Sequence, residues 1–477
     1  MRRLFLLGTG PLLEDGATVM SGQCLRTWHF AAPLLARHED YEVHLMTVPI
    51  PGTTRDEVDP PAENADYQGF RYTRLLSNDQ NRILPVIAEY IERSRPDALV
   101  GINAYPAYLL SWLRMLQNPR MGRPLWADLN GWTMAEAQVA VAAGNKGSYS
   151  HFWRMEALTL LAADRFSTVT DRQAYALYGE LAMIGRLTGS LFAEEMAVSV
   201  ANAVYPDYAR LERRAGLAPV LKGRVPPGAR VVLWSGGFNS WTDIPLLRDA
   251  LKRAMESEPS LHFVATGGAI VGHDEATHAL FQSVAADLPA DRVHALGWID
   301  FRHVLELHAT AHVGINIDGA NTETRFGARN RLTNMMGAGL PVITTRGTEI
   351  AEWIERHGLG AVVPLGDAAG LADVLVESVR DSGAWQERAA RARRAALRDF
   401  APEATLASFL AWVAAPAPAR DTGDAADSAS AMRAWVLRRA AMEQPFAGLD
   451  RAEATHGGGE PPTILSKFIR KLKGASP

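Results

Sequence analysis

Short apolar runs that alternate with helical patterns are the feature that most constrains the fold of this chain. Near the N-terminus, RLFLLGTG and YEVHLMTV have the length and composition of buried strands, and LRTWHFAAPLLARH between them has the spacing of an amphipathic helix. Further strands are expected at DALVGI, PLWADL and RFSTVT, residues 97–102, 124–129 and 165–170. Strands that alternate with helices predict a parallel sheet covered by helices on both faces.

The pattern starts again after a basic stretch rich in proline and glycine at residues 217–230. Further segments that each end in a turn then follow: ARVVLWSGG, LHFVATGG, RVHALGW, HVGINID, LPVITT and GAVVPLG. The sequence therefore predicts an α/β protein with two Rossmann-like parallel-sheet domains, at 1–216 and 229–400, joined by a linker at 217–228 and followed by helices and a flexible tail at 401–477. Because ligands of such sheets bind beyond the carboxyl ends of the strands, two facing sheets would enclose a cleft.

Composition limits the classes of protein to consider. A chain of 477 residues is too long for one core, which agrees with two domains. Charged residues make up 21% and the net charge is −4, so the overall charge gives no reason to expect nucleic-acid binding. The single cysteine, Cys24, excludes an intrachain disulfide and a cysteine-based metal site. No apolar run approaches the ~20 residues of a membrane span, and we expect a cytoplasmic protein without a signal peptide.

The segment TETRFGARNRLTNMMGAGLPVITT raises a question of charge. Arg325, Arg329 and Arg331 stand at the start of an expected short helix, where the partial positive charge of the helix disfavours cations. A diphosphate at this helix start would be bound by the arginines and by the free N–H groups together. The alternative is that the arginines extend into solvent or pair with Glu323 and Asp318.

A second candidate for ligand binding is WSGGFNSWTD, which follows an expected strand and precedes the helix IPLLRDALKRAM. Gly236 and Gly237 would let the backbone approach a ligand closely, and Asn239 belongs to the same turn. The helix start offers free N–H groups to an anion. A tight turn from strand to helix without any ligand explains the two glycines equally well.

In their order along the chain, these segments resemble the GT-B glycosyltransferases, in particular the large retaining family that uses nucleotide sugars, in its bacterial cell-surface and natural-product branch. The resemblance rests on the Gly-Gly turn, the GW at 297–298, the strand AHVGINI, the charged loop and the turn GAGLPVITT, and it covers roughly residues 1–400. It implies a nucleoside-diphosphate sugar held mainly by the C-terminal domain, an acceptor on the N-terminal domain, and neither a metal nor another cofactor.

The resemblance also implies roles for residues of the N-terminal domain. Ser21 and Gly22 match a glycine loop that lies near the donor phosphates and the acceptor. Asn130 ends an expected strand where many relatives have a histidine that faces the sugar, so it could hydrogen-bond a sugar hydroxyl but could not titrate. Glu136 follows at a helix start, where a favourable interaction with the helix dipole explains an acid at least as well.

The C-terminal domain departs from the family pattern in two places. Many relatives have an Arg and a Lys after the first strand of this domain, whereas GGFNSWTD contains no cation. Many relatives also have a Glu-x7-Glu motif, whose positions are Phe326 and Asn334 here, and Asn334 could still hydrogen-bond a ribose hydroxyl. We infer that Arg325, Arg329 and Arg331 replace the missing cations, and that Arg329 and Arg331 bind the diphosphate.

Glu349 begins the helix EIAEWIERH, near the place where relatives carry an acid that meets sugar hydroxyls, although a helix-start charge explains it equally well. Together these observations predict a retaining, metal-independent glycosyltransferase that moves a sugar from a nucleoside-diphosphate sugar to a small-molecule, glycan or lipid-linked acceptor. A nucleotide-sugar epimerase or a pseudo-glycosyltransferase of the same fold is one alternative. A degenerate module that binds a sugar or a partner without catalysis is another.

The region after residue 400 has a different character. A helix at 401–413 is expected to pack near the hinge between the domains. Residues 463–473 form a short basic segment whose apolar residues recur on one helical face. Such a helix can lie in a membrane interface, which would give weak peripheral membrane contact. Docking of the same face on the protein's own N-terminal domain is the alternative that we favour.

Overall fold

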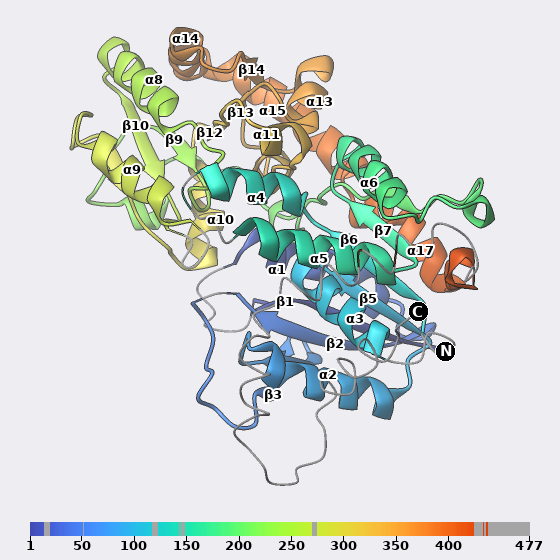
Figure 1. Cartoon of the computed structure of the whole chain (residues 1–477). Helices are drawn as coiled ribbons and strands as arrows, with labels where there is room; N and C mark the ends of the chain where they lie inside the picture. The colour runs from blue at the N-terminus through green and yellow to red at the C-terminus, as the bar shows by residue number, and fades with distance from the viewer. Residues whose placement is uncertain are drawn as a thin grey trace.

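The N-terminal domain is built on an eight-stranded sheet, which occupies the lower part of the computed structural model in Figure 1. The strand order is β3-β4-β2-β1-β5-β6-β7-β8, and every neighbouring pair is parallel except β3 with β4. The strands are β1 (Arg2–Gly10), β2 (Tyr41–Pro49), β3 (Ala62–Tyr67), β4 (Phe70–Leu75), β5 (Ala98–Ile102), β6 (Leu125–Leu129), β7 (Arg165–Thr168) and β8 (Ala197–Ser199). The helical elements are α1 (Gly22–Leu35), α2 (Gln80–Ser94), α3 (Ala104–Leu116), α4 (Thr133–Ala142), α5 (Ser148–Ala162), α6 (Asp171–Met183) and the 3-10 turn η2 (Gly189–Leu191).

The C-terminal domain contains a six-stranded sheet in the order β11-β10-β9-β12-β13-β14, with all neighbouring strands parallel. The strands are β9 (Arg230–Trp234), β10 (Leu261–Ala265), β11 (Val293–Ala295), β12 (Val313–Asn316), β13 (Val342–Thr345) and β14 (Ala361–Val363). The helices are α8 (Ile244–Ser257), α9 (Ala276–Ala285), α10 (Phe301–Thr310), α11 (Thr322–Phe326), α12 (Asn330–Gly337), α13 (Glu349–His357), α14 (Ala368–Arg380) and α15 (Ser382–Asp399). The predicted fold class, two parallel-sheet α/β domains, is confirmed.

The structure describes residues 1–13, 20–50, 52–116, 123–142, 144, 148–269, 274–423, 433 and 436. Within these ranges, no helix is both long enough and apolar enough to cross a membrane. The basic segment at 463–473 and its predicted membrane contact lie outside the described residues. That contact stays a prediction.

Strand β1 shows why the sequence forms sheets that are covered on both faces. Leu4, Phe5, Leu6 and Leu7 are all completely buried, although successive side chains of a strand point to opposite faces. Leu4 and Leu6 pack into one apolar cluster, whereas Phe5 and Leu7 pack into another on the opposite face. A continuous apolar run is therefore the pattern that a strand covered by helices on both faces requires.

The crossover between the domains lies upstream of the predicted linker at 217–228. The backbone N–H of Tyr205 already donates to Asn334 Oδ1 at 2.9 Å, and the short helix α7 (Pro206–Ala209) packs against α12. The predicted linker itself contains the 3-10 turn η3 (Pro219–Leu221), which packs against α10. Ala218, Leu221 and Val225 of this segment are buried in the apolar cluster, whereas most of its other residues are exposed.

After α15 the chain returns to the N-terminal domain, as Figure 1 shows for α17. The helix expected at 401–413 is divided into α16 (Pro402–Thr405) and α17 (Ala407–Ala414), and the 3-10 turn η4 (Arg420–Gly423) follows. Phe409 of α17 is fully buried, with its ring 4.8 Å from that of Phe30 and 5.2 Å from that of Trp126. The C-terminal segment thus packs on the N-terminal sheet and holds the domains together a second time.

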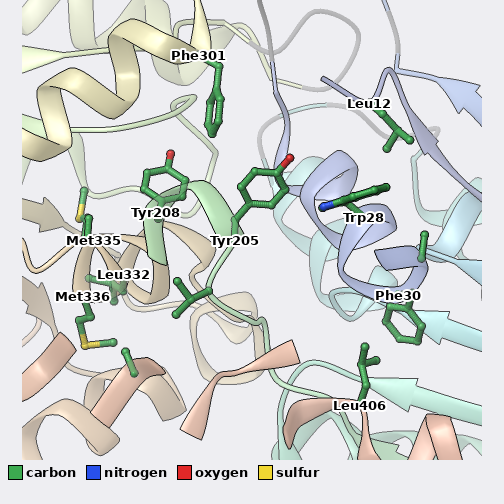
Figure 2. Packing of buried hydrophobic residues seen from close by; sticks show 14 of the residues in the cluster. Leu12, Trp28, Phe30, Tyr205, Tyr208, Phe301, Leu332, Met335, Met336 and Leu406 are labelled. Carbon is green, nitrogen blue, oxygen red and sulfur yellow. The ribbon is translucent and has the colours of Figure 1, made fainter. Parts of the chain in front are cut away.

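One apolar cluster runs from the N-terminal domain into the C-terminal domain without a break. Figure 2 shows part of it, with side chains from α1, the crossover, α10, α12 and the turn before α17: Trp28, Phe30, Tyr205, Tyr208, Phe301, Leu332, Met335, Met336 and Leu406. Leu332, Met335 and Met336 were expected on one side of their helix, and they form the face of α12 that enters this cluster. The first two residues of α12, Asn330 and Arg331, lie outside this apolar face and are half-buried.

We expect Phe409→Ala to destabilise the protein by about 3 to 5 kcal/mol, because it removes a fully buried ring and leaves a cavity. Chemical denaturation followed by tryptophan fluorescence measures the change. Phe192→Ala is the matched control, since 87% of that side chain is exposed, and it should change the stability by less than about 0.5 kcal/mol. Equal effects of both substitutions would contradict the docking of α17.

Candidate functional site

Segments that follow the strands of one domain contact segments that follow the strands of the other. The turn after β7 reaches the C-terminal domain, where Thr170 Oγ1 donates to the carbonyl of Phe326 at 2.8 Å. The ring of Trp132, after β6, lies 4.7 Å from the ring of Phe326. Since ligands of parallel sheets bind at the carboxyl ends of strands, this interdomain surface is where a site is expected.

Two helix starts meet at this surface. Ser21 caps α1, where its hydroxyl accepts from the N–H of Cys24 at 3.2 Å. Asn330, the first residue of α12, donates from Nδ2 to the carbonyl of Gly22 at 3.3 Å. A Cβ at Gly22 would lie only 2.9 Å from Asn330 Nδ2. Glycine at position 22 therefore allows the two helix starts to approach each other.

The Gly-Gly turn and the arginine-rich segment, which the sequence presents separately, come together at the same place. Arg331 Nη2 donates to the carbonyl of Gly237 at 2.9 Å. The guanidinium also stacks on the indole of Trp234, 4.2 Å from the ring centre. Gly236 has a φ of +106°, which an L side chain rarely adopts. The two sequence candidates are thus two walls of one site.

Arg331 forms no ion pair with the described residues, and the charge of Asp318 acts on it only from a greater distance. No carboxylate within the described ranges lies at ion-pair distance from it, and its Nη1 is buried without a hydrogen-bond partner. Partial removal from water lowers the pKa of Arg331 to about 10, so the side chain remains a cation at neutral pH. A buried guanidinium nitrogen without an acceptor is costly unless a ligand supplies one. An anion at this position would remove that cost.

Arg329 has a different environment, because two buried carboxylates neutralise it. Its Nε lies 3.0 Å from Asp318 Oδ2, and its Nη2 lies 2.7 Å from Glu323 Oε2. A further hydrogen bond joins Nη1 to Glu323 Oε1 at 2.9 Å. This is the alternative stated above for this arginine. Its donors are engaged within the protein, so its contacts favour a positioning role and not the direct phosphate contact that we expected.

The third arginine, Arg325, lies at the rim. Its side chain is exposed, and its carbonyl accepts from Arg172 Nη1 at 3.3 Å. Asn239 is half-buried in the Gly-Gly turn, where its carbonyl accepts from the N–H of Thr242 at 2.8 Å. No hydrogen bond of the Asn239 side chain is formed with the described residues, so its amide remains available to a ligand.

Phe326 and Asn334, which replace the expected glutamates, serve the contact between the domains. Phe326 packs against Trp132, as described above, and its carbonyl accepts from Thr170. Asn334 is 3% exposed, and its Oδ1 accepts the backbone N–H of Tyr205. The ribose contact expected for Asn334 conflicts with this burial, because the amide oxygen is already used to hold the crossover.

Glu349 caps a helix of the other domain. Its carboxylate accepts from the backbone N–H of Asp171 at 3.1 Å and from that of Arg172 at 2.6 Å, at the start of α6. Arg172 in turn donates to Glu352 at 2.6 Å and to the carbonyl of Gly347 at 2.8 Å. These bonds form an interdomain clamp. A sugar contact of Glu349 would require the clamp to open, and sequence patterns gave no signal for Arg172 because its partners are distant in the chain.

Asn130 belongs to a polar network at the carboxyl end of β6. Its Nδ2 donates to Asn103 Oδ1 at 2.9 Å, and Asn103 Nδ2 donates to the carbonyl of Gln23 at 3.1 Å. Asn103 is buried with a φ of +75°, a conformation that asparagine tolerates better than most residues. The network connects Asn130 with the first turn of α1, so Asn130 lies on the same side of the site as the candidates Ser21 and Gly22.

Two further side chains at this surface were missed or given little weight in the sequence. Trp298 is 42% exposed, and its Nε1 donates to the carbonyl of Ala269 at 3.0 Å. Glu136 of α4 lies near Glu323 and Arg329 of the other domain. The GW pair at 297–298 was the available sequence signal for Trp298. Among the described residues, no group of three or more His, Cys, Asp or Glu side chains is arranged to hold a metal ion.

Comparison with known proteins agrees with this architecture. Residues 229–381, within the C-terminal domain, match the family model described as "Glycosyl transferases group 1". No curated protein matches the sequence. Solved structures match nearly the whole chain.

Three of these structures illustrate the likeness. Sucrose-phosphate synthase from Thermosynechococcus elongatus has a TM-score of 0.62 at 16% identity, over 87% of this chain and 100% of that chain. HepE from Anabaena, in complex with UDP-glucose, has a TM-score of 0.59 at 14% identity, over 87% and 100%. The UDP-forming α,α-trehalose-phosphate synthase from Burkholderia vietnamiensis has a TM-score of 0.59 at 14% identity, over 90% and 98%. At these identities the likeness shows the fold, and the chain has the GT-B fold expected from its sequence.

The interdomain clamp gives a direct prediction. Glu349→Ala should destabilise the protein by about 1 kcal/mol, because it leaves the first N–H groups of α6 without their acceptor. Denaturant titration measures the loss. Glu387→Ala, at an exposed position of α15, is the control and should be neutral. A Glu349→Ala protein as stable as the control would mean that the clamp contributes nothing.

Proposed function

We propose that the protein is a glycosyltransferase that moves a sugar from a nucleoside-diphosphate sugar, with UDP as the favoured nucleotide, to an acceptor bound in the cleft. The observation that carries the proposal is the guanidinium of Arg331, which forms no ion pair with the described residues and lies between the Gly-Gly turn and two meeting helix starts. The family model that matches within the C-terminal domain supports transfer of a sugar. The relatives crystallised with UDP and UDP-glucose support the choice of nucleotide.

The diphosphate would bind where three kinds of donor converge. Arg331 Nη1 is free to donate. The N–H groups of Asn330 and Arg331, at the start of α12, have no acceptor among the described residues. The first N–H groups of α1, at Gly22, face the same place from the other domain. Backbone N–H groups at helix starts, together with a guanidinium, are well suited to phosphate oxygens.

During transfer, the bond between the anomeric carbon and a diphosphate oxygen breaks, and negative charge grows on the leaving diphosphate. Donors that are already fixed in place stabilise that charge without reorganising. Arg331 is held by its bond to Gly237 and by the Trp234 ring. In the metal-independent mechanism that we propose, this arginine supplies the positive charge at the diphosphate.

Arg329 acts indirectly in this proposal. Its ion pairs with Asp318 and Glu323 hold the end of β12 and helix α11 against the start of α12. A buried group of one cation and two carboxylates fixes geometry well, although its net contribution to stability is small or negative. Arg329 would thereby orient the residue two positions further on, Arg331, toward the leaving group.

The nucleobase would lie toward Trp298. The turn at Gly267 and Gly268 packs directly on the Gly-Gly turn, and a Cβ at Gly268 would lie 3.6 Å from Trp298 Nε1. The exposed indole of Trp298 provides a flat aromatic surface for stacking. The order along the site would therefore be base, diphosphate, sugar, with the sugar next to the N-terminal domain.

We propose a retaining outcome, in which the acceptor hydroxyl attacks from the face that the diphosphate leaves. The acceptor O–H bond breaks as the new bond to the anomeric carbon forms, and a diphosphate oxygen takes the proton. This reaction needs no protein base. It requires close positioning of both substrates, which the N-terminal wall with Asn130 and Gly22 would provide.

Arg331→Ala should weaken the binding of UDP by at least about 1.5 kcal/mol, or roughly tenfold in Kd, since it removes charged hydrogen bonds to the diphosphate. Isothermal titration calorimetry measures the change. Arg253→Ala, an exposed arginine of α8, should leave affinity unchanged. Unaltered UDP affinity in Arg331→Ala would refute the assignment of the diphosphate site.

Arg329→Ala distinguishes the proposed role of Arg329 from that of Arg331. It leaves Asp318 and Glu323 buried without their cation, so we expect a loss of stability of about 3 to 5 kcal/mol together with weaker UDP binding. Arg331→Ala should weaken binding without such a loss of stability. If Arg329→Ala were as stable as the unmodified protein and bound UDP less tightly, Arg329 would be a direct ligand after all.

A panel of nucleotide sugars, with release of nucleoside diphosphate and the anomeric configuration of the product as readouts, tests the reaction itself. Transfer with retention is expected. Conversion of the donor sugar without an acceptor would favour an epimerase of the same fold. Binding of UDP without turnover of any donor would favour the non-catalytic module, and an inverted product would refute retention.

A further inference from the structure

Glu136 is a half-buried carboxyl group on the side of the N-terminal domain that faces the C-terminal domain, and the proposed reaction does not yet use it. It lies in the first turns of α4, and α4 packs against α11 of the C-terminal domain. The nearest charged groups on the facing domain are Glu323 and Arg329. Its own domain adds Glu156 from α5, whose carboxyl also feels the charge of Glu136.

The Glu136 carboxyl has no hydrogen-bond or ion-pair partner among the described residues. Glu136 is half-buried, and within the described residues its side chain takes part in no hydrogen bond and no ion pair. A Cβ at Gly131 would come within 2.6 Å of Glu136 Oε1, and Gly131 has a φ of +99°. The carboxyl oxygen therefore occupies the space that a Cβ would take at position 131, which favours glycine there. Nearby carboxyls differ in this respect, because Glu323 is bound by Arg329 and Glu156 accepts from Thr133 Oγ1.

The surroundings of Glu136 determine its protonation state. Burial, followed by the negative charge of Glu323, raises the pKa of Glu136 to about 8, and Arg329 offsets only part of this. At neutral pH the group is mostly a neutral carboxylic acid, which has one O–H donor and retains acceptor capacity. The explanation by the helix dipole, which requires a negative charge at the start of α4, does not fit a neutral acid.

We propose that Glu136 binds a substrate sugar hydroxyl in its protonated form, donating through its O–H and accepting through its carbonyl oxygen. A hydroxyl group is itself a donor and an acceptor, so it matches both functions of the acid. The nearby carboxylate of Glu323 makes an anionic group unfavourable at this position. The inference rests on the proposed function, and it assigns Glu136 to recognition of a neutral ring, either the transferred sugar or the acceptor.

The test is the pH dependence of steady-state transfer, measured from pH 6 to pH 9.5 with donor and acceptor varied in turn. For the unmodified protein, KM of the substrate that Glu136 holds should rise about tenfold above pH 8, because the ionised carboxylate loses its donor and meets Glu323 as a like charge. The substrate whose KM changes identifies whose hydroxyl is bound. Glu89→Gln, at an exposed position of α2, is the control and should keep the unmodified profile.

Two substitutions complete the test. Glu136→Gln keeps one donor and one acceptor at the same distance, so KM should stay within about threefold at pH 7 and should no longer rise above pH 8. Glu136→Ala should raise KM about tenfold at all pH values, from the loss of one or two hydrogen bonds. If Glu136 had only a structural role, Glu136→Gln and Glu136→Ala would change the stability of the protein, and KM would still rise above pH 8 in both variants.

Other outcomes overturn the inference. An unchanged alkaline rise in Glu136→Gln shows that another group titrates. Activity that increases with pH and is abolished by Glu136→Gln shows that the ionised carboxylate acts as a base. The proposed function fails separately, if the unmodified protein transfers sugar from none of the donors, whereas normal transfer by Glu136→Ala with unchanged KM defeats only the role of Glu136.

Discussion

Tyr205 joins the two domains through both of its polar ends, and the site depends on this junction. Its backbone N–H is bound by Asn334 of α12, and its hydroxyl forms a 2.5 Å hydrogen bond with the hydroxyl of Tyr67 in the N-terminal sheet. Around it, the apolar cluster of Figure 2 continues from α1 to α12. Because the apolar face of α12 is fixed in this cluster, its N-terminus is directed to the start of α1. The two helix starts therefore meet at the place where we propose that the diphosphate binds.

At this place, two arginines of one short segment have opposite environments. Arg329 is surrounded by carboxylates and is satisfied by the protein alone, whereas Arg331 rests on an indole ring and a backbone carbonyl and retains a donor without an acceptor. The first arrangement stabilises a loop conformation, and the second suits a ligand. A guanidinium on an aromatic face keeps its charge available to an anion, because the ring compensates it only weakly.

Much of the fold was predictable from local patterns, since apolar runs of strand length between helical segments specify parallel sheets, and β1 and β9 lie where those patterns placed them. The grouping of the Gly-Gly turn with the arginines was predictable from the family order of motifs. The ion pairs of Arg329 could not be predicted, because the sequence shows that Asp318 and Glu323 are nearby but does not show how their side chains are oriented. The hydrogen bonds of Glu349 with Asp171 and of Asn334 with Tyr205 connect residues more than 100 positions apart, and no local pattern carries that information.

The central claim is that Arg331 Nη1 is the unused donor of a diphosphate site. A structure of the protein with UDP bound tests it most directly. We predict a diphosphate oxygen within hydrogen-bond distance of Arg331 Nη1 and close to the N–H groups at the start of α12, with the ion pairs of Arg329 intact. A diphosphate bound elsewhere, or bound with Arg331 still unpaired, would contradict the account.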